Sequence, residues 1–250
     1  MDERKIGTLV QWIEECSRIV FFGGAGVSTE SGVPDFRSKD GLYNQKDIRF
    51  DSYSPEYLLS HSCLVEHPDV FFEFYKQKMD ARHVEPNDAH KFLAKLEEMG
   101  KLTAVVTQNI DYLHQRAGSR KVYEIHGTTY TNYCMRCKKK YGPDYLYGAE
   151  DRIPRCDCGG MIRPDVTLYE EALPDEAVRA SVDAICDADM LIIGGTSLRV
   201  YPANSYIHYF RGKHLVVINR EPLGLRMDPA KDLEINDPIG EVFAAISDMS

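Results

Sequence analysis

The fold is decided by the stretch Ile19-Val20-Phe21-Phe22-Gly23-Gly24-Ala25-Gly26-Val27-Ser28. Its four leading apolar residues are typical of a strand buried on both faces of a parallel sheet. The glycines that follow let the backbone approach a pyrophosphate, and a helix beginning there would offer free N–H groups and the positive end of its dipole. The stretch predicts a strand and turn that bind a dinucleotide, although such a glycine turn also occurs as a plain tight turn.

The fingerprint of hydride-transferring dehydrogenases is incomplete in this chain. It would place a third glycine where Thr29 stands. No second strand follows that ends in an acidic residue about twenty positions further on. The sequence therefore disfavours hydride-transfer enzymes.

Helical and strand patterns alternate along most of the chain. Apolar residues at three- and four-residue steps predict helices near residues 6–16, 89–99, 178–185 and 239–246, and apolar runs predict strands at 102–107, 190–193 and 215–218. Strands that alternate with helices are typical of a parallel sheet covered on both faces. The sequence therefore predicts a doubly wound α/β fold.

Two stretches depart from this alternation. Residues 38–86 are rich in aromatic and charged residues at helical spacing and predict an inserted helical module. Residues 128–173 contain clustered cysteines and little periodicity, and predict a small module held by a metal. We expect both to form one smaller lobe beside a dinucleotide-binding domain made of residues 1–37, 87–127 and 174–250.

Four of the seven cysteines have the spacing Cys134-x2-Cys137-x18-Cys156-x-Cys158. Four thiolates satisfy a tetrahedral zinc ion and leave no position for water, so we expect a structural site that stabilises a segment poor in apolar residues. Only one residue separates the second pair, which leaves a ligand from elsewhere in the chain as an alternative. Four reduced thiols without metal are a further alternative.

The charge balance restricts the partners. Thirty Lys and Arg residues oppose 39 Asp and Glu residues, which gives a net charge of −9. A surface that coats nucleic acid needs net positive charge, so we expect no direct nucleic-acid partner. We therefore expect the basic residues between 136 and 140 to form the solvent-exposed end of the cysteine loop rather than a nucleic-acid-binding zinc knuckle. An acidic protein instead tolerates basic partners such as Lys-rich peptides.

No apolar run reaches the length of about 18 residues that a membrane-spanning helix needs. The start Met1-Asp2-Glu3 is acidic, unlike the basic beginning of a secretory signal. Clustered thiols without an export signal indicate a reducing compartment. We therefore expect a cytoplasmic protein with no membrane partner.

Polar side chains follow two of the predicted strands. Asn109 and Asp111 come after one strand, and His126 comes after another. Ligand sites in open α/β sheets gather at the carboxyl ends of strands, so we expect these side chains to converge with Gly24. His126 is the candidate general base because imidazole titrates near neutral pH, although a single histidine is more often a packed or surface residue.

A second short motif, Pro34-Asp35-Phe36-Arg37, follows the glycine turn closely. It would place one aromatic face and one fixed cation over whatever the turn binds. An exposed loop without a ligand is the alternative interpretation.

Considered together and in order, these motifs resemble the sirtuins, a family of NAD-dependent protein lysine deacylases, and in particular its compact bacterial-type members. The resemblance runs from about residue 6 to residue 245. It implies a Rossmann-like domain, a smaller lobe with one structural zinc, and NAD and an acyl-lysine protein or peptide meeting between them. The motifs that carry it are Gly24–Ser28, Gly32–Arg37, Thr107–Asp111, His126-Gly127, the four cysteines, Gly195–Leu198 and Val217–Asn219.

The resemblance also implies a reaction and its residues. The acyl oxygen of the substrate attacks C1′ of the nicotinamide ribose, nicotinamide leaves, and water finally releases free lysine and 2′-O-acyl-ADP-ribose. His126 would act as base toward the ribose hydroxyls, and Asn109 would be the second catalytic residue. Phe36, Ile110 and Asp111 would line the nicotinamide pocket. The residues implied in binding NAD are Gly24, Ala25, Gly26, Ser28, Thr29, Asp35, Phe36, Arg37, Gln108, Ile110, Asp111, Gly195, Thr196, Ser197, Asn219 and Asp237.

Two departures from the family pattern concern the substrate. The family segment that pairs with the substrate peptide usually carries Phe-Gly-Glu, whereas this chain has Tyr169-Glu170-Glu171, so we expect altered docking by strand addition. Phe72 and Tyr75 stand where members selective for acidic acyl groups carry Tyr and Arg. Without an arginine to pair a succinyl carboxylate, we expect a preference for acetyl or other uncharged acyl groups.

Two other functions remain open at this point. Mono-ADP-ribosyl transfer would use the same NAD site and the same loss of nicotinamide, so only its products distinguish it. The protein could also be a non-catalytic zinc-ribbon interaction module on a nucleotide-sensing fold. Replacing His126 would then leave its behaviour unaltered.

Overall fold

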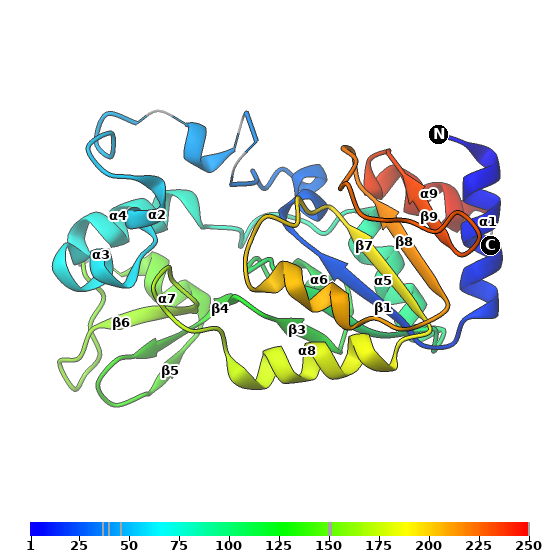
Figure 1. Cartoon of the computed structure of the whole chain (residues 1–250). Coiled ribbons are helices and arrows are strands. Elements are labelled where there is room, and N and C mark those ends of the chain that lie inside the picture. The colour runs from blue at the N-terminus through cyan, green and yellow to red at the C-terminus, as the bar shows by residue number, and fades with distance from the viewer. Residues whose placement is uncertain (37, 40, 46, 150–151, 250) are drawn as a thin grey trace.

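The computed structural model describes residues 1–249 except residues 37, 40, 46, 150 and 151. Six parallel strands form the main sheet in the order β3-β2-β1-β7-β8-β9 (Figure 1). The chain thus winds outward in two directions from the central pair β1 and β7, which confirms the doubly wound α/β fold. The strands are β1 (Ile19–Gly23), β2 (Leu102–Thr107), β3 (Val122–Glu124), β7 (Met190–Gly194), β8 (His214–Ile218) and β9 (Asp232–Ile235).

The apolar run of β1 is buried on both faces of the sheet. Ile19 and Phe21 belong to the hydrophobic cluster on one face, and Val20 and Phe22 belong to the cluster on the other. Successive side chains of a strand point to opposite faces, which accounts for this division. Burying each such large side chain is worth about 1.5–3 kcal/mol, so the run fixes β1 as the centre of the domain.

Helices cover both faces of the main sheet (Figure 1). The helices α1 (Glu3–Glu15), α5 (Asp88–Glu98) and α9 (Ile239–Met249) contribute to the cluster that contains Phe21. Helix α8 (Asp175–Asp187) and the 3-10 helix Ala203–Tyr209 contribute to the cluster that contains Phe22. The short helix α6 (Leu113–Arg116) follows β2. No helix in the described part of the chain is long and apolar enough to cross a membrane.

The chain after β1 differs from the sequence-based expectation. Two 3-10 turns, Ala25–Val27 and Thr29–Ser31, replace the expected helix. The second turn ends at Gly32, whose φ of +88° no helix can continue, and Pro34 follows shortly afterwards. The expected dipole of a regular helix is therefore not available at the glycine turn, and only backbone N–H groups remain there.

The smaller lobe contains a second sheet with strand order β5-β4-β6, in which the pairs are antiparallel. The sequence pattern did not predict these strands, because the glycines and prolines of residues 128–173 interrupt the alternation of polar and apolar residues. The strands are β4 (Gly127–Cys134), β5 (Lys140–Tyr141) and β6 (Ile162–Val166). The helices of the lobe are α2 (Pro55–Leu58), α3 (His61–Glu66), α4 (Pro68–Lys78) and α7 (Pro143–Gly148), together with the 3-10 turn Leu42–Asn44.

The two insertions pack against each other. Phe71, Phe72 and Tyr75 of α4 share one hydrophobic cluster with Leu146 of α7 and Val166 of β6. The helical residues therefore cover the second sheet, as Figure 1 also shows at the end of the molecule opposite the chain termini. The exact residues at which the two domains divide stay a prediction.

Candidate active site

A crevice of about 1520 Å³ lies where the carboxyl ends of β1, β2, β7 and β8 meet segments of the smaller lobe. This is the position at which open α/β sheets bind ligands. Most of the residues proposed from the sequence line it. Those residues are Gly24, Ala25, Gly26, Thr29, Asp35, Phe36, Gln108, Asn109, Ile110, His126, Gly195, Thr196, Ser197 and Asn219.

The glycines at the crevice are required by the contact between two turns. The N–H of Gly26 donates to the carbonyl of Gly195 at 2.8 Å. A Cβ on Gly26 would lie 2.8 Å from that carbonyl oxygen, and one on Gly24 would lie 2.9 Å from Cβ of Thr196. Gly195 itself has φ +57°, a conformation that side chains disfavour. The turns after β1 and β7 therefore approach each other closely and leave bare backbone on the crevice wall.

A line of polar contacts joins the ends of three strands. Gln108, just after β2, donates from Nε2 to Oγ1 of Thr196 at 3.1 Å. The N–H of Thr196, after β7, donates to Oδ1 of Asn219, after β8, at 3.1 Å. These bonds fix three side chains that a dinucleotide lying across the strand ends would meet.

A buried polar cluster stands behind the crevice wall. Ser28 donates its hydroxyl hydrogen to Oδ2 of Asp111 at 2.7 Å and accepts a hydrogen bond from Nδ2 of Asn109 at 3.0 Å. Burial raises the pKa of Asp111, and the hydrogen bonds from Ser28 and from the N–H of Leu113 oppose that rise. His90 lies 3.5 Å from the Ser28 hydroxyl, and burial lowers its pKa to about 4, so its ring is neutral. The cluster holds Asn109 and Asp111 in fixed positions.

The geometry of His126 suits a base. Its Nδ1 lies 2.9 Å from the backbone carbonyl oxygen of Gln108. A carbonyl oxygen only accepts hydrogen bonds, so Nδ1 carries the ring proton. In the neutral ring Nε2 then has a lone pair, and the side chain lines the crevice. The imidazole is therefore held in the tautomer that accepts a proton through Nε2.

Some of the proposed residues lie elsewhere or cannot be placed. Ser28 and Asp111 are behind the lining residues rather than among them. Asp237 does not line the crevice, and its carboxylate lies 4.0 Å from the N-terminal amine of Met1. Arg37 lies outside the described residues, and its proposed contact with NAD stays a prediction.

The sequence did not single out Glu124, at the end of β3. Burial raises the pKa of this carboxyl to about 7, and its Oε1 has no hydrogen-bond partner among the described residues. A glutamate at a strand end looks like any polar residue in the sequence. Only the fold shows that this one is shielded from water.

One end of the crevice lies in the smaller lobe. Tyr75 lines it together with the apolar side chains Leu59, Met79 and Val166. Phe72, the other position compared with the family, lies in the core of the lobe and is absent from the described lining. The arginines in the described lining, Arg199 and Arg220, come from the loops after β7 and β8.

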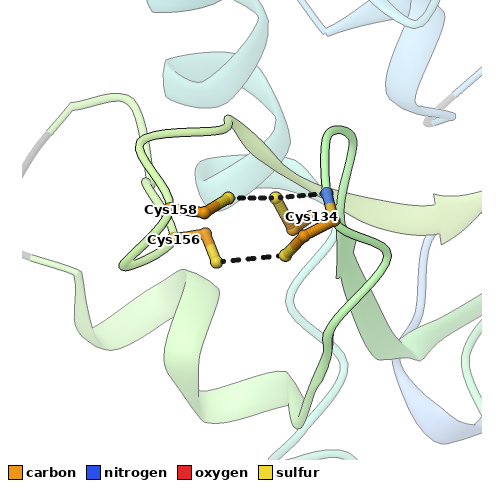
Figure 2. A group of neighbouring side chains, drawn as sticks. Cys134, Cys156 and Cys158 are labelled. Atoms are coloured by element: carbon orange, nitrogen blue, oxygen red, sulfur yellow. Dashed lines mark hydrogen bonds between the residues drawn. The ribbon is translucent and has the colours of Figure 1, made fainter.

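The four clustered cysteines converge between two loops of the smaller lobe. Their sulfur atoms lie within 4.8 Å of one another, with Cys134 3.5 Å from Cys158 and Cys137 3.6 Å from Cys156 (Figure 2). These separations are far longer than the disulfide bond of about 2.05 Å. They match the spacing of about 3.8 Å expected around a tetrahedral zinc with Zn–S bonds of about 2.3 Å. The cysteine set therefore fits a structural zinc ion.

The fold and the crevice define a class of protein: an enzyme that binds a dinucleotide at the ends of a doubly wound sheet and carries a zinc-stabilised lobe. The Sir2 family model matches residues 24–202. The chain belongs to the Sir2 family, the sirtuins.

Curated relatives match over almost their full length. The NAD-dependent protein deacetylase of Clostridium acetobutylicum is 53% identical over 243 residues, covering 97% of this chain and 98% of the relative. The protein of the same name from Cutibacterium acnes is 51% identical over 239 residues, covering 95% and 96%.

Solved structures agree in fold. A Sir2 structure with a p53 peptide and NAD+ has a TM-score of 0.82 and 35% identity, covering 98% of both chains. A Sir2 structure bound to an acetylated peptide has a TM-score of 0.82 and 34% identity, again covering 98% of both chains.

Proposed function

We propose that the chain is an NAD-dependent protein lysine deacetylase. The observation that carries the proposal is His126, whose Nδ1 proton is held by the Gln108 carbonyl in the crevice that the glycine turn also lines. The deacetylase relatives at 53% and 51% identity support it. A suitable test supplies acetyl-lysine peptide and NAD+ and measures free lysine peptide, nicotinamide and 2′-O-acetyl-ADP-ribose.

The proposed mechanism uses NAD as a substrate. The backbone N–H groups of Ala25 and Ser197, which have no partner among the described residues, bind its pyrophosphate, and Thr196 and Asn219 bind its adenosine half. Asn109, which lines the crevice, contacts the nicotinamide carboxamide, and Asp111 behind it fixes the Ser28 hydroxyl that Asn109 binds.

The acyl oxygen of the lysine substrate attacks C1′ of the nicotinamide ribose while the bond from C1′ to nicotinamide breaks and its electron pair leaves with nicotinamide. Phe36, edge-on to Tyr43 at 5.5 Å between ring centroids, shields the electron-poor C1′ from water. Nε2 of His126 then accepts a proton from a ribose hydroxyl, which allows the ribose oxygen to attack the acyl carbon. Water finally releases the free lysine and the acetylated ADP-ribose.

The partner we propose is an acetyl-lysine-bearing protein or peptide rather than nucleic acid. The structural relative bound to an acetylated peptide supports this choice. We also propose a cytoplasmic location, which the unpaired cysteine thiols support because structural disulfides are rare there.

The acyl pocket predicts a preference among substrates. Leu59, Met79 and Val166 present apolar surface, and the nearby buried guanidinium of Arg163 is bound to Glu171. Arg163 is therefore not available to pair a succinyl carboxylate, which would be desolvated against this apolar surface. We expect kcat/KM for succinyl-lysine peptide to be at least about 100-fold below that for acetyl-lysine peptide, because an unpaired buried charge costs several kcal/mol. Equal efficiencies in parallel assays on one peptide sequence would refute this preference.

The cluster behind the crevice predicts the effect of Ser28→Ala. The change leaves Asp111 without its hydroxyl donor and Asn109 without an acceptor. We expect kcat/KM for NAD to fall about 10- to 100-fold, since hydrogen bonds to charged groups contribute about 1.5–3 kcal/mol. The matched control is Ser31→Ala, because the Ser31 hydroxyl is buried without a partner among the described residues. Equal kinetics for the two variants would contradict the role of the cluster.

A further inference from the structure

The segment Leu168–Glu171 forms a β-turn at the edge of the crevice. The N–H of Glu171 donates to the carbonyl of Leu168 at 3.1 Å, and Glu170 has φ +76°. The third residue of a type II turn has this positive φ, and glycine is favoured there because any other side chain is strained. The chain therefore keeps a conformation suited to glycine while placing a glutamate in it.

Something must hold Glu170 in this strained conformation, and its own carboxylate does so. Oε2 of Glu170 accepts a hydrogen bond from the N–H of Ser62 at 2.9 Å and another from the Ser62 hydroxyl at 2.7 Å. Ser62 belongs to α3, which lies about 108 positions earlier in the sequence. The side chain thus joins the turn to the helical part of the smaller lobe.

Backbone contacts place the turn beside the same helix. The N–H of Tyr169 donates to the carbonyl of Leu59 at 3.0 Å, and the N–H of His61 donates to the carbonyl of Tyr169 at 3.1 Å. Tyr169 is therefore paired on its α3 side. The backbone N–H and carbonyl of Glu170, in contrast, have no hydrogen-bond partner within the described residues, and Glu170 is an exposed residue of the crevice lining.

We propose that Glu170 is a positioning residue for the substrate peptide: its carboxylate clamps the turn to Ser62 and so presents a preformed backbone edge to the acyl-lysine peptide. This inference rests on the proposed function, because it assigns the edge to that peptide. Main-chain pairing at an exposed backbone edge supplies affinity, and an edge ordered beforehand does not lose conformational entropy when the peptide binds.

The neighbouring glutamate does not substitute for this clamp. Glu171 accepts hydrogen bonds from the guanidinium of Arg163 and from the N–H of Leu168, and it lies 2.9 Å from Nδ1 of His61. These contacts hold the far end of the turn and remain when Glu170 is changed. Loss of the clamp is therefore expected to loosen the edge without unfolding the lobe.

The test measures binding of a fluorescent acetyl-lysine peptide by anisotropy in the absence of NAD, so that it does not depend on turnover. For Glu170→Ala we expect a Kd at least about tenfold higher, because both hydrogen bonds from Ser62 to the carboxylate are lost, with kcat at saturating peptide unchanged. Glu170→Gln is expected to bind within about threefold of the unchanged protein, because its amide oxygen accepts the same two hydrogens. Glu176→Ala, which removes an exposed charge from α8, is the control and is expected to bind normally.

Glu170→Gly separates the clamp from the strain. Glycine adopts φ +76° without strain but has no carboxylate, so we expect peptide binding as weak as in Glu170→Ala together with a higher melting temperature than Glu170→Ala. The double variant Glu170→Ala/Ser62→Ala is expected to bind no more weakly than Glu170→Ala alone. Unchanged peptide affinity in Glu170→Ala or in Glu170→Gly would overturn the clamp. Failure of the unchanged protein to release nicotinamide would instead count against the proposed function.

Discussion

Replacing His126 with alanine is expected to lower kcat/KM for deacetylation by about 10²- to 10⁴-fold, the usual contribution of a positioned general base. The structure gives the physical reason. The Gln108 carbonyl holds the proton on Nδ1, so Nε2 is the basic nitrogen, and alanine supplies no group that accepts a proton. The measurement is the rate of peptide deacetylation at saturating NAD.

The control for this experiment is His83→Ala, which removes an exposed histidine that is not part of the crevice. It is expected to leave the rate unchanged, and both variants are expected to keep their zinc. A His126→Ala protein that retained most of its deacetylation activity would show that His126 is not the general base.

Loss of the zinc site is expected to have the largest effect on stability. Apparent binding free energies of structural zinc are about 10–16 kcal/mol near pH 7, and that energy is available only to the folded site. The cluster around Cys134 and Cys156 contains little else, since Ile162 is the only other residue buried within it in the described structure. We therefore expect Cys156→Ala, or extraction with a strong chelator, to unfold the smaller lobe.

Metal analysis and thermal unfolding check this expectation. The unchanged protein should contain one zinc per chain, and Cys156→Ala should contain little and should unfold at a markedly lower temperature. Cys186→Ala is the matched control, because that thiol is exposed and lies outside the cluster. A Cys156→Ala protein as stable as the Cys186→Ala protein would show that the four thiols have no structural role.

The sequence predicted the features that are local. The apolar run Ile19–Phe22 predicted a strand buried on both faces, and the structure places that strand at the centre of the sheet. The four cysteines were grouped by spacing alone, and the structure brings their sulfurs together. In both cases the residues that identify the feature lie within one short segment of the chain.

Features that depend on distant contacts were not predictable. The strands β4 and β6 pair across a loop and contain glycine and proline, so no simple alternation marked them. The prediction of a regular helix after β1 was wrong, because the positive φ of Gly32 ends the second 3-10 turn and no helix continues from it. The shielding of Glu124, the hydrogen bond from Ser28 to Asp111 and the contact between Glu170 and Ser62 join positions far apart in the chain.

The most direct test of the account follows the fate of NAD itself. Purified protein with full zinc content would be incubated with acetyl-lysine peptide and NAD+, and the products would be followed by mass spectrometry. We predict equal amounts of nicotinamide, deacetylated peptide and 2′-O-acetyl-ADP-ribose. NAD+ that stays intact, is reduced to NADH, or gives ADP-ribose attached to protein without deacetylated peptide would contradict it.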